Sequence, residues 1–161
     1  MDLKPIEIFI DADACPVKDE TYKVAQRYGL KTWVVSNAFM QIPASPLIAR
    51  VIVEAGPDAA DDWIAGEVAR GDVVVTNDIP LAERALQAGG YALAANGKVF
   101  DENSIGSAMA QRALMEQLRS TGEMLGGPRP FDRNDRSRFL QSLDQLIQKE
   151  RRRRALQGGR S

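Results

Sequence analysis

The chain has 161 residues, of which 44% are hydrophobic and 27% are charged, and its formal net charge at pH 7 is −1. This length favours one domain with a single core, and the hydrophobic content is well above that of disordered chains. The sequence contains no histidine. This excludes catalytic triads and metal sites that use imidazole, so any chemistry must rely on carboxylates, metals, lysine, arginine or hydroxyl groups.

Three features of the sequence predict a cytoplasmic protein. Cys15 is the only cysteine, so no internal disulfide can form. The N-terminus lacks the basic-then-apolar pattern of a signal peptide, and no apolar run approaches the length of a transmembrane helix. We therefore expect neither a membrane nor a disulfide partner, and the sequence leaves the oligomeric state open.

The chain alternates between strand and helix patterns. Residues 6–10 form an apolar strand that runs into Asp11 and Asp13, and Pro16 begins a helix that extends to about Tyr28. Further strands are expected in chain order at residues 32–35, 51–53, 73–76 and 91–95. Further helices are expected at residues 60–70, 81–88 and 104–121.

The last part of the chain predicts an amphipathic helix followed by a basic segment. Five apolar residues mark one face of this helix: Phe139, Leu140, Leu143, Leu146 and Ile147. We place a single domain at residues 1–150 and predict that residues 151–161, which begin with four arginines, form a basic, disordered tail. The alternation of elements indicates an α/β fold with a central, mainly parallel sheet of about five strands and helices on both faces.

The conspicuous acids of the sequence fall at one edge of this expected sheet. Asp11 and Asp13 end the first strand, and Asp78 follows the fourth. Asp61 and Asp62 begin the helix that leads into the fourth strand. Because ligands of open parallel sheets bind beyond the carboxyl ends of the strands, these five carboxylates are candidates for one site.

Carboxylates that lie close together repel one another unless a proton or a cation offsets their charge. A ligand set made only of oxygen atoms favours a hard ion, so Mg²⁺ or Mn²⁺ is the expected cofactor. Such a site can activate a water molecule and neutralise charge on a phosphodiester, which makes nucleic-acid cleavage one hypothesis.

Each candidate also has an ordinary structural interpretation. Asp11 could be a turn residue after a strand, and Thr76 and Asn77, which we consider as substrate-binding residues, could be polar loop residues. Helix capping is the alternative role of three acids: Asp61, Asp62 and Asp78.

Basic residues near the C-terminus offer a second kind of site. Three arginines of a Gly- and Pro-rich loop are candidate phosphate ligands: Arg129, Arg133 and Arg136. They could equally pair with the neighbouring Asp132 and Asp135. The run at residues 151–154 could add salt-dependent affinity for RNA, or simply complement the dipole of the preceding helix.

Three segments of the sequence resemble the YaiI/YqxD family, an uncharacterised bacterial group of PIN-like proteins: residues 10–16, 60–65 and 75–82. The likeness extends through residues 126–131 and covers roughly residues 6–148. It implies a three-layer, PIN-like α/β fold. The nuclease members of that fold hold Mg²⁺ or Mn²⁺ with acids at positions that correspond to Asp11, Asp61 and Asp78.

The sequence departs from PIN nucleases in one respect. These nucleases usually add an acid from the middle of the chain, and the nearest candidate, Glu54, does not lie in a matching motif. Asp13 or Asp62 would have to substitute for it, or the site is incomplete for cleavage. The leading hypothesis is a metal-dependent ribonuclease in which one of these two residues orients the attacking water.

Two other functions remain open. The first is a non-catalytic RNA-binding module that uses the basic C-terminal segment, with structural aspartates. The second is a phosphatase of the haloacid-dehalogenase type, because Asp11 and Asp13 after an apolar strand also begin that chemistry. That class needs a later lysine and a further acidic motif, for which the sequence offers no convincing candidates.

Overall fold

The structure is a computed structural model that describes residues 4–54, 56, 58–122 and 130–158. The elements in this part of the chain are, in order, β1 (Glu7–Asp11), α1 (Lys18–Tyr28), β2 (Lys31–Ser36), β3 (Ile48–Ile52), α2 (Ala59–Glu67), β4 (Val73–Val75), α3 (Ile79–Gln87), β5 (Tyr91–Leu93), β6 (Val99–Phe100), α4 (Glu102–Ser120) and α5 (Arg133–Gly158). The expected α/β class with a mainly parallel sheet is therefore confirmed.

The sheet has the strand order β3-β2-β1-β4-β5-β6, and every neighbouring pair is parallel except β5 and β6. We expected about five strands. The sixth, β6, has only two residues, too few to show an alternating pattern, and pairs antiparallel with β5. The chain builds β2 and β3 on one side of β1, and then β4 and β5 on the other. The strand order thus reverses between β1 and β4, where α/β sheets place their ligand crevice.

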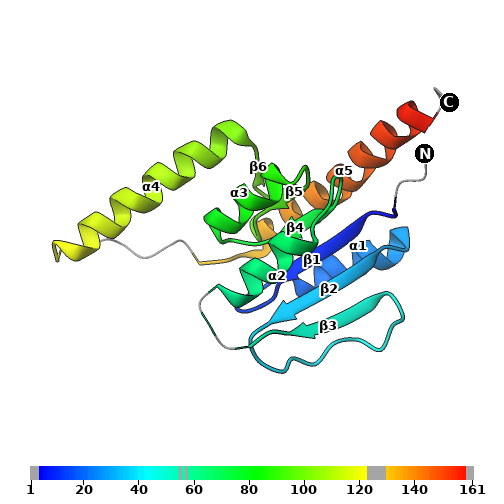
Figure 1. Ribbon diagram of the computed structural model, residues 1–161, viewed down its shortest axis with the longest axis horizontal. Helices are drawn as coiled ribbons and strands as arrows, with labels where there is room; N and C mark the ends of the chain where they lie inside the picture. The colour runs from blue at the N-terminus through cyan, green and yellow to red at the C-terminus, as the bar shows by residue number, and fades with distance from the viewer. Residues whose placement is uncertain (1–3, 55, 57, 123–129, 159–161) are drawn as a thin grey trace.

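Helices cover both faces of the sheet and make three layers (Figure 1). In β1, Ile8 and Ile10 pack with α1 and α5, whereas Phe9 packs on the other face with α2 and α3. In β4, Val74 shares the face of Phe9. Because both faces are covered, the central strands are apolar at nearly every position.

Helix α4 leaves the body of the protein after its first turn. It begins at Asp101, whose side chain accepts a hydrogen bond from the Ser104 amide while the Ser104 hydroxyl accepts one from the Asp101 amide. Ile105 is its buried residue and packs in the core beside α3. The rest of α4 extends to one side of the molecule (Figure 1).

Helix α5 corrects the expectation of a disordered tail from residue 151. Residues 151–158 continue the helix, and residues 159–161 lie outside the described residues. The reason is Glu150, which is buried and accepts hydrogen bonds from Arg153, Arg154 and the Tyr91 hydroxyl. The two arginines stand three and four residues after Glu150, the spacing at which side chains meet on a helix.

The described helices include none that is both long enough and apolar enough to cross a membrane.

Candidate functional site

A hollow of about 210 Å³ lies at the carboxyl ends of β1 and β4, where the strand order reverses. Its polar lining comes from the end of β1 and from the loops that follow β1 and β4, and it includes Asp11, Asp13, Thr76, Asn77 and Asp78. We call it the acidic hollow. Two separate parts of the sequence thus meet at one site because β1 and β4 are neighbouring parallel strands.

Thr76 connects the two acids that end β1 and precede α3. Its hydroxyl donates to Asp11 Oδ2 at 2.8 Å and accepts from the Asp78 amide at 2.9 Å. Asp78 Oδ1 also accepts from the Leu81 amide at 2.9 Å, so Asp78 is the N-cap of α3. These bonds use one carboxylate oxygen of each acid. Within the described chain, Asp11 Oδ1 and Asp78 Oδ2 accept no hydrogen bond.

Two further contacts fix the loops around the acidic hollow. Asp13 is exposed, and its Oδ2 accepts a hydrogen bond from the Asn37 amide at 3.0 Å. Asn77 Oδ1 accepts from the Ala95 amide at 2.9 Å, which ties the loop after β4 to the end of β5. Asn77 therefore has a structural role, as its sequence position also allowed.

Asp61, in the first turn of α2, is coupled electrostatically to the acids of the hollow. Burial and the charges of Asp78 and Asp11 raise its pKa to about 6, with Asp58 adding to the shift and Arg84 weakly opposing it. Burial also raises the pKa of Asp11, as do the charges of Asp78 and Asp13, although the Thr76 hydrogen bond opposes this. The carboxylates therefore destabilise one another's charged form.

Asp62 is not part of this cluster. Its carboxylate is exposed and forms an ion pair with Arg84, with 2.8 Å between Oδ1 and Nη1. Neighbouring residues of a helix point about 100° apart, so the side chains of Asp61 and Asp62 leave α2 in different directions. Glu54 is exposed just after β3.

The sequence analysis missed Asp58, which raises the pKa of Asp61. The two residues are three apart at the start of α2, a spacing that places side chains on one helix face. That spacing was visible in the sequence and could have identified Asp58.

The donor atoms of the cluster suit a hard divalent cation, because they are carboxylate oxygens whose mutual repulsion a cation would relieve. Across the described ranges, however, no group of three Asp, Glu or Cys side chains is arranged so that it could hold a metal ion. The cluster therefore offers the type of ligand atom that such an ion prefers. In their present positions, however, the side chains do not form a complete set of ligands.

The arginines expected in the C-terminal loop do not gather at the acidic hollow. Arg129 lies outside the described residues, and Arg133 is exposed at the start of α5. Arg136 bonds to the Pro16 carbonyl at 2.9 Å and to Glu20 Oε1 at 2.8 Å, and so attaches α5 to the start of α1. The structural interpretation therefore accounts for Arg136, although its acidic partner is Glu20.

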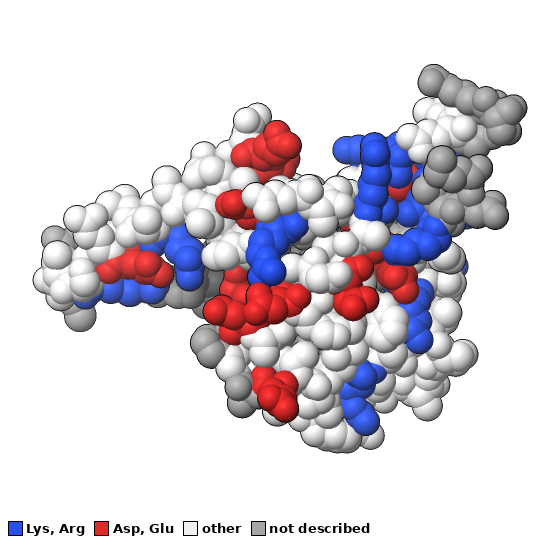
Figure 2. All heavy atoms as spheres, in the orientation of Figure 1, with Lys and Arg blue, Asp and Glu red and all other residues white. Residues whose placement is uncertain are grey.

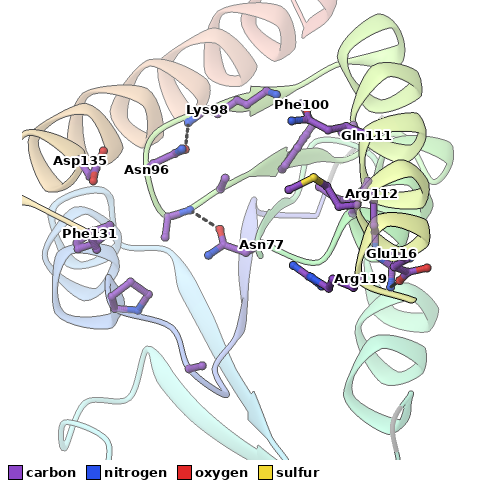
Figure 3. A pocket seen from close by; sticks show the side chains of 17 residues that line it. Asn77, Asn96, Lys98, Phe100, Gln111, Arg112, Glu116, Arg119, Phe131 and Asp135 are labelled. Atoms are coloured by element: carbon purple, nitrogen blue, oxygen red, sulfur yellow. Dashed lines mark hydrogen bonds and ion pairs between the residues drawn. The ribbon is translucent and has the colours of Figure 1, made fainter. Parts of the chain in front are cut away.

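A larger cavity of about 820 Å³ adjoins the acidic hollow and shares four lining residues with it: Ala14, Pro16, Asn77 and Ala95. Figure 3 shows its walls: α4 on one side, the β5–β6 turn above, and Phe131 on the other side. We call it the α4 groove. Its basic side chains are Lys98, Arg112 and Arg119. The sequence offered Lys98 as a possible phosphate contact without a recognised phosphate-loop pattern, and it did not point to Arg112 or Arg119, which only the tertiary placement of α4 brings near the acids.

Charge is separated over the surface of the molecule. Figure 2 shows acidic side chains gathered over and beside α2, and basic side chains gathered over the C-terminal half of α5. Arg153 and Arg154 of that basic group are bound to Glu150, so part of this charge is already neutralised within the fold.

Comparison with known proteins gives consistent relatives. A "UPF0178 protein" of Caulobacter vibrioides (strain NA1000 / CB15N) is 62% identical over 145 residues, which cover 90% of this chain and 95% of the relative. A second, from Rhodopseudomonas palustris (strain BisB5), is 58% identical over 94% of this chain and 92% of its own. A third, from Gluconacetobacter diazotrophicus, is 55% identical over 93% and 97%.

No solved structure matches the chain. The family model described as "Uncharacterized BCR, YaiI/YqxD family" matches residues 9–149, which include both segments that line the acidic hollow. This protein therefore belongs to the YaiI/YqxD family.

Proposed function

We propose that this protein is a divalent-metal-dependent hydrolase that cleaves RNA phosphodiesters at the acidic hollow. The observation that carries the proposal is the meeting of Asp11, Asp13 and Asp78 around one hollow at the point where the strand order reverses. Clustered carboxylates at this point of an α/β sheet are suited to hold a cation next to a ligand.

In this proposal, Asp11, Asp61 and Asp78 hold Mg²⁺ or Mn²⁺. The oxygens Asp11 Oδ1 and Asp78 Oδ2 would serve as ligands, since the hydrogen bonds of the described chain occupy the other oxygen of each acid. Asp61 would complete the set after a change of side-chain rotamer. The ion would make a bound water more acidic and neutralise negative charge on the phosphate.

The remaining polar residues have supporting roles. The Thr76 hydroxyl holds Asp11 in one orientation, which limits the rearrangement needed when a ligand binds. Asp13 is the acid that we assign to orient the attacking water, because it lines the acidic hollow and is exposed. Asp62 is not assigned a catalytic role, since Arg84 binds it outside the cluster.

The two alternative functions have less support. An RNA-binding module that uses the basic C-terminal segment would have only part of its charge available, because Arg153 and Arg154, two of the four arginines, are bound to buried Glu150. A phosphatase of the haloacid-dehalogenase type needs a lysine near its aspartates, and the described lining of the acidic hollow contains none.

The test is cleavage of end-labelled single-stranded RNA in Mn²⁺ by the protein and by two variants. Asp11→Asn can still accept the hydrogen bond from Thr76 through its amide oxygen, but it removes the negative charge and one of the two oxygen donors, so cleavage should fall at least about 100-fold. Asp62→Asn is the matched control and should cleave at the wild-type rate. Equal cleavage by wild type and Asp11→Asn would overturn the proposal, because a contaminating nuclease would then explain the activity.

A further inference from the structure

The α4 groove has the features of a binding site for a larger ligand than the acidic hollow can hold. Its volume of about 820 Å³ falls within the range of about 300–1,000 Å³ typical of ligand sites, whereas the 210 Å³ of the acidic hollow falls below it. The two share Asn77 and Ala95 in their linings, so they adjoin each other. A substrate whose reacting group lies at the acids would extend into the groove.

The charged lining of the hollow is acidic, whereas the groove has three basic side chains beside two acids, Glu116 and Asp135. Arg119 makes no ion pair with any described residue, and Figure 3 shows it pointing from α4 toward Asn77. Lys98 lies on the facing wall, 5.7 Å from the ring of Phe100, and makes no ion pair within the described residues, although its charge helps to lower the pKa of Asp101. Arg112 is partly offset by Glu116 at 3.7 Å. Two cations thus remain available for an anion in the groove.

The walls between these cations are apolar. Phe100, Phe131 and Met115 line the groove. Phe100 is buried in the core, whereas Phe131 and Met115 are partly buried and present apolar surface to the groove. Aromatic and apolar surface next to free cations suits a ligand that carries both phosphates and planar rings, and single-stranded nucleic acid has both. A duplex does not offer its bases in this way.

We propose that the α4 groove binds a single strand of nucleic acid, with its phosphates against Lys98 and Arg119 and its bases on Phe131 and Met115. This inference rests on the proposed function, which identifies the reacting group as a phosphodiester. It adds that the substrate is single-stranded and that it lies in the α4 groove. The strand passes from the groove over Asn77 into the acidic hollow.

The groove is tested by binding, which does not require cleavage. Fluorescence anisotropy with a labelled 12-nucleotide single-stranded RNA in EDTA compares the wild type, the double variant Lys98→Gln/Arg119→Gln, and the control Arg152→Gln. The double variant should bind on the order of tenfold more weakly and lose about 1.4 from its salt slope, about 0.7 for each phosphate contact. Arg152 is exposed on α5, outside both cavities, so its variant should bind like the wild type.

Three results would contradict the proposal that the α4 groove binds a single strand. These are no binding of the strand by the wild type, an equal loss of affinity in the double variant and the control, or an equal affinity for duplex RNA. Single-stranded DNA of the same sequence is run in parallel and should bind with comparable affinity, because the assigned contacts do not involve the 2′-hydroxyl. Specific strand binding without any cleavage in Mn²⁺ would support the groove and reject the hydrolase. Cleavage with an unchanged KM in the double variant would reject the groove and leave the hydrolase standing.

Discussion

Carboxylates lie at both ends of the strands, which we call the amino edge and the carboxyl edge of the sheet, and their neighbours differ between the two edges. At the amino edge, Asp72 is fully buried and accepts hydrogen bonds from Lys4 Nζ at 2.7 Å and from the amides of Glu7 and Ala69. Burial alone would raise the pKa of Glu150, but hydrogen bonds from its arginines and from Tyr91 lower it to about 2. At the carboxyl edge, burial and neighbouring acids raise the pKa of Asp11 and of Asp61.

The comparison indicates which carboxylates serve the fold. The amino edge supplies a cation or an amide for each acid from the chain itself, so these acids stabilise the native state. The carboxyl edge collects acids whose main neighbours are other acids, which costs stability. Costs of this kind are typical of functional sites, where an external ligand offsets the charge.

The largest effect is expected at the amino edge. Glu150→Gln would leave Arg153 and Arg154 beside an uncharged group in a buried site, so the free energy of unfolding should fall by about 3 kcal/mol. Urea unfolding followed by circular dichroism measures this loss. Glu67→Gln, an exposed change of the same kind, is the control. Equal stability of the two variants would show that the buried network does not hold α5.

The next effect distinguishes the carboxyl edge by its response to a cation. Mn²⁺ at about ten times its Kd should stabilise the native state by about 1.4 kcal/mol at pH 7.5, measured as a rise in Tm. Asp11→Asn should abolish this rise. Because the pKa of Asp61 is about 6, a proton competes with the metal at pH 5, and the rise should be smaller there. An equal rise in Tm for Asp11→Asn and the wild type would show that Mn²⁺ does not bind at the carboxyl edge.

Neutralising Asp61 should raise the free energy of unfolding, whereas neutralising Glu150 should lower it. Because the folded-state pKa of Asp61 is raised to about 6 from 3.8, its favourable contribution is complete below pH 3.8 and is lost as pH rises through 6. Asp61→Asn should therefore stabilise the metal-free protein at pH 7, by about 1 kcal/mol once solvent screening is allowed for. Unfolding at pH 4 and pH 7 measures the effect, and destabilisation at pH 7 would contradict it.

The smallest effect belongs to Asp62. Asp62→Asn breaks an exposed ion pair with Arg84 and should change stability by less than about 0.5 kcal/mol. Its Tm shift in Mn²⁺ should match that of the wild type, since Arg84 holds the side chain away from the cluster. Loss of the Mn²⁺-induced Tm shift in this variant would place Asp62 among the metal ligands of the carboxyl edge.

The part of the site that depends on strand order could be predicted from the sequence. Apolar strand patterns end just before Asp11 and Asp78, and parallel strands bring their carboxyl ends together, so the meeting of these acids follows from local signals. The choice between Asp61 and Asp62 depends on rotation about α2 relative to the sheet. Local sequence patterns do not define that rotation, and only the family resemblance favoured Asp61.

Tertiary contacts explain the features that the sequence did not reveal. The four arginines at residues 151–154 resemble a solvated terminus until Glu150 is known to be buried beside Tyr91, 59 residues away. Lys98 and Arg119 belong to the α4 groove only because α4 is directed past the β5–β6 turn. Contacts between distant segments, which no local pattern encodes, decide both cases.

The extension of α5 has a consequence for the shortest chain that can fold. The last apolar residue of the core is Ile147, so a truncation after residue 150 looks harmless by hydrophobic content alone. Such a truncation would remove both arginines that bind Glu150, together with the 2.6 Å hydrogen bond from Arg154 to the Lys4 carbonyl that holds the start of β1. We therefore expect the shortest stable chain to reach at least residue 154, several residues beyond its last core side chain.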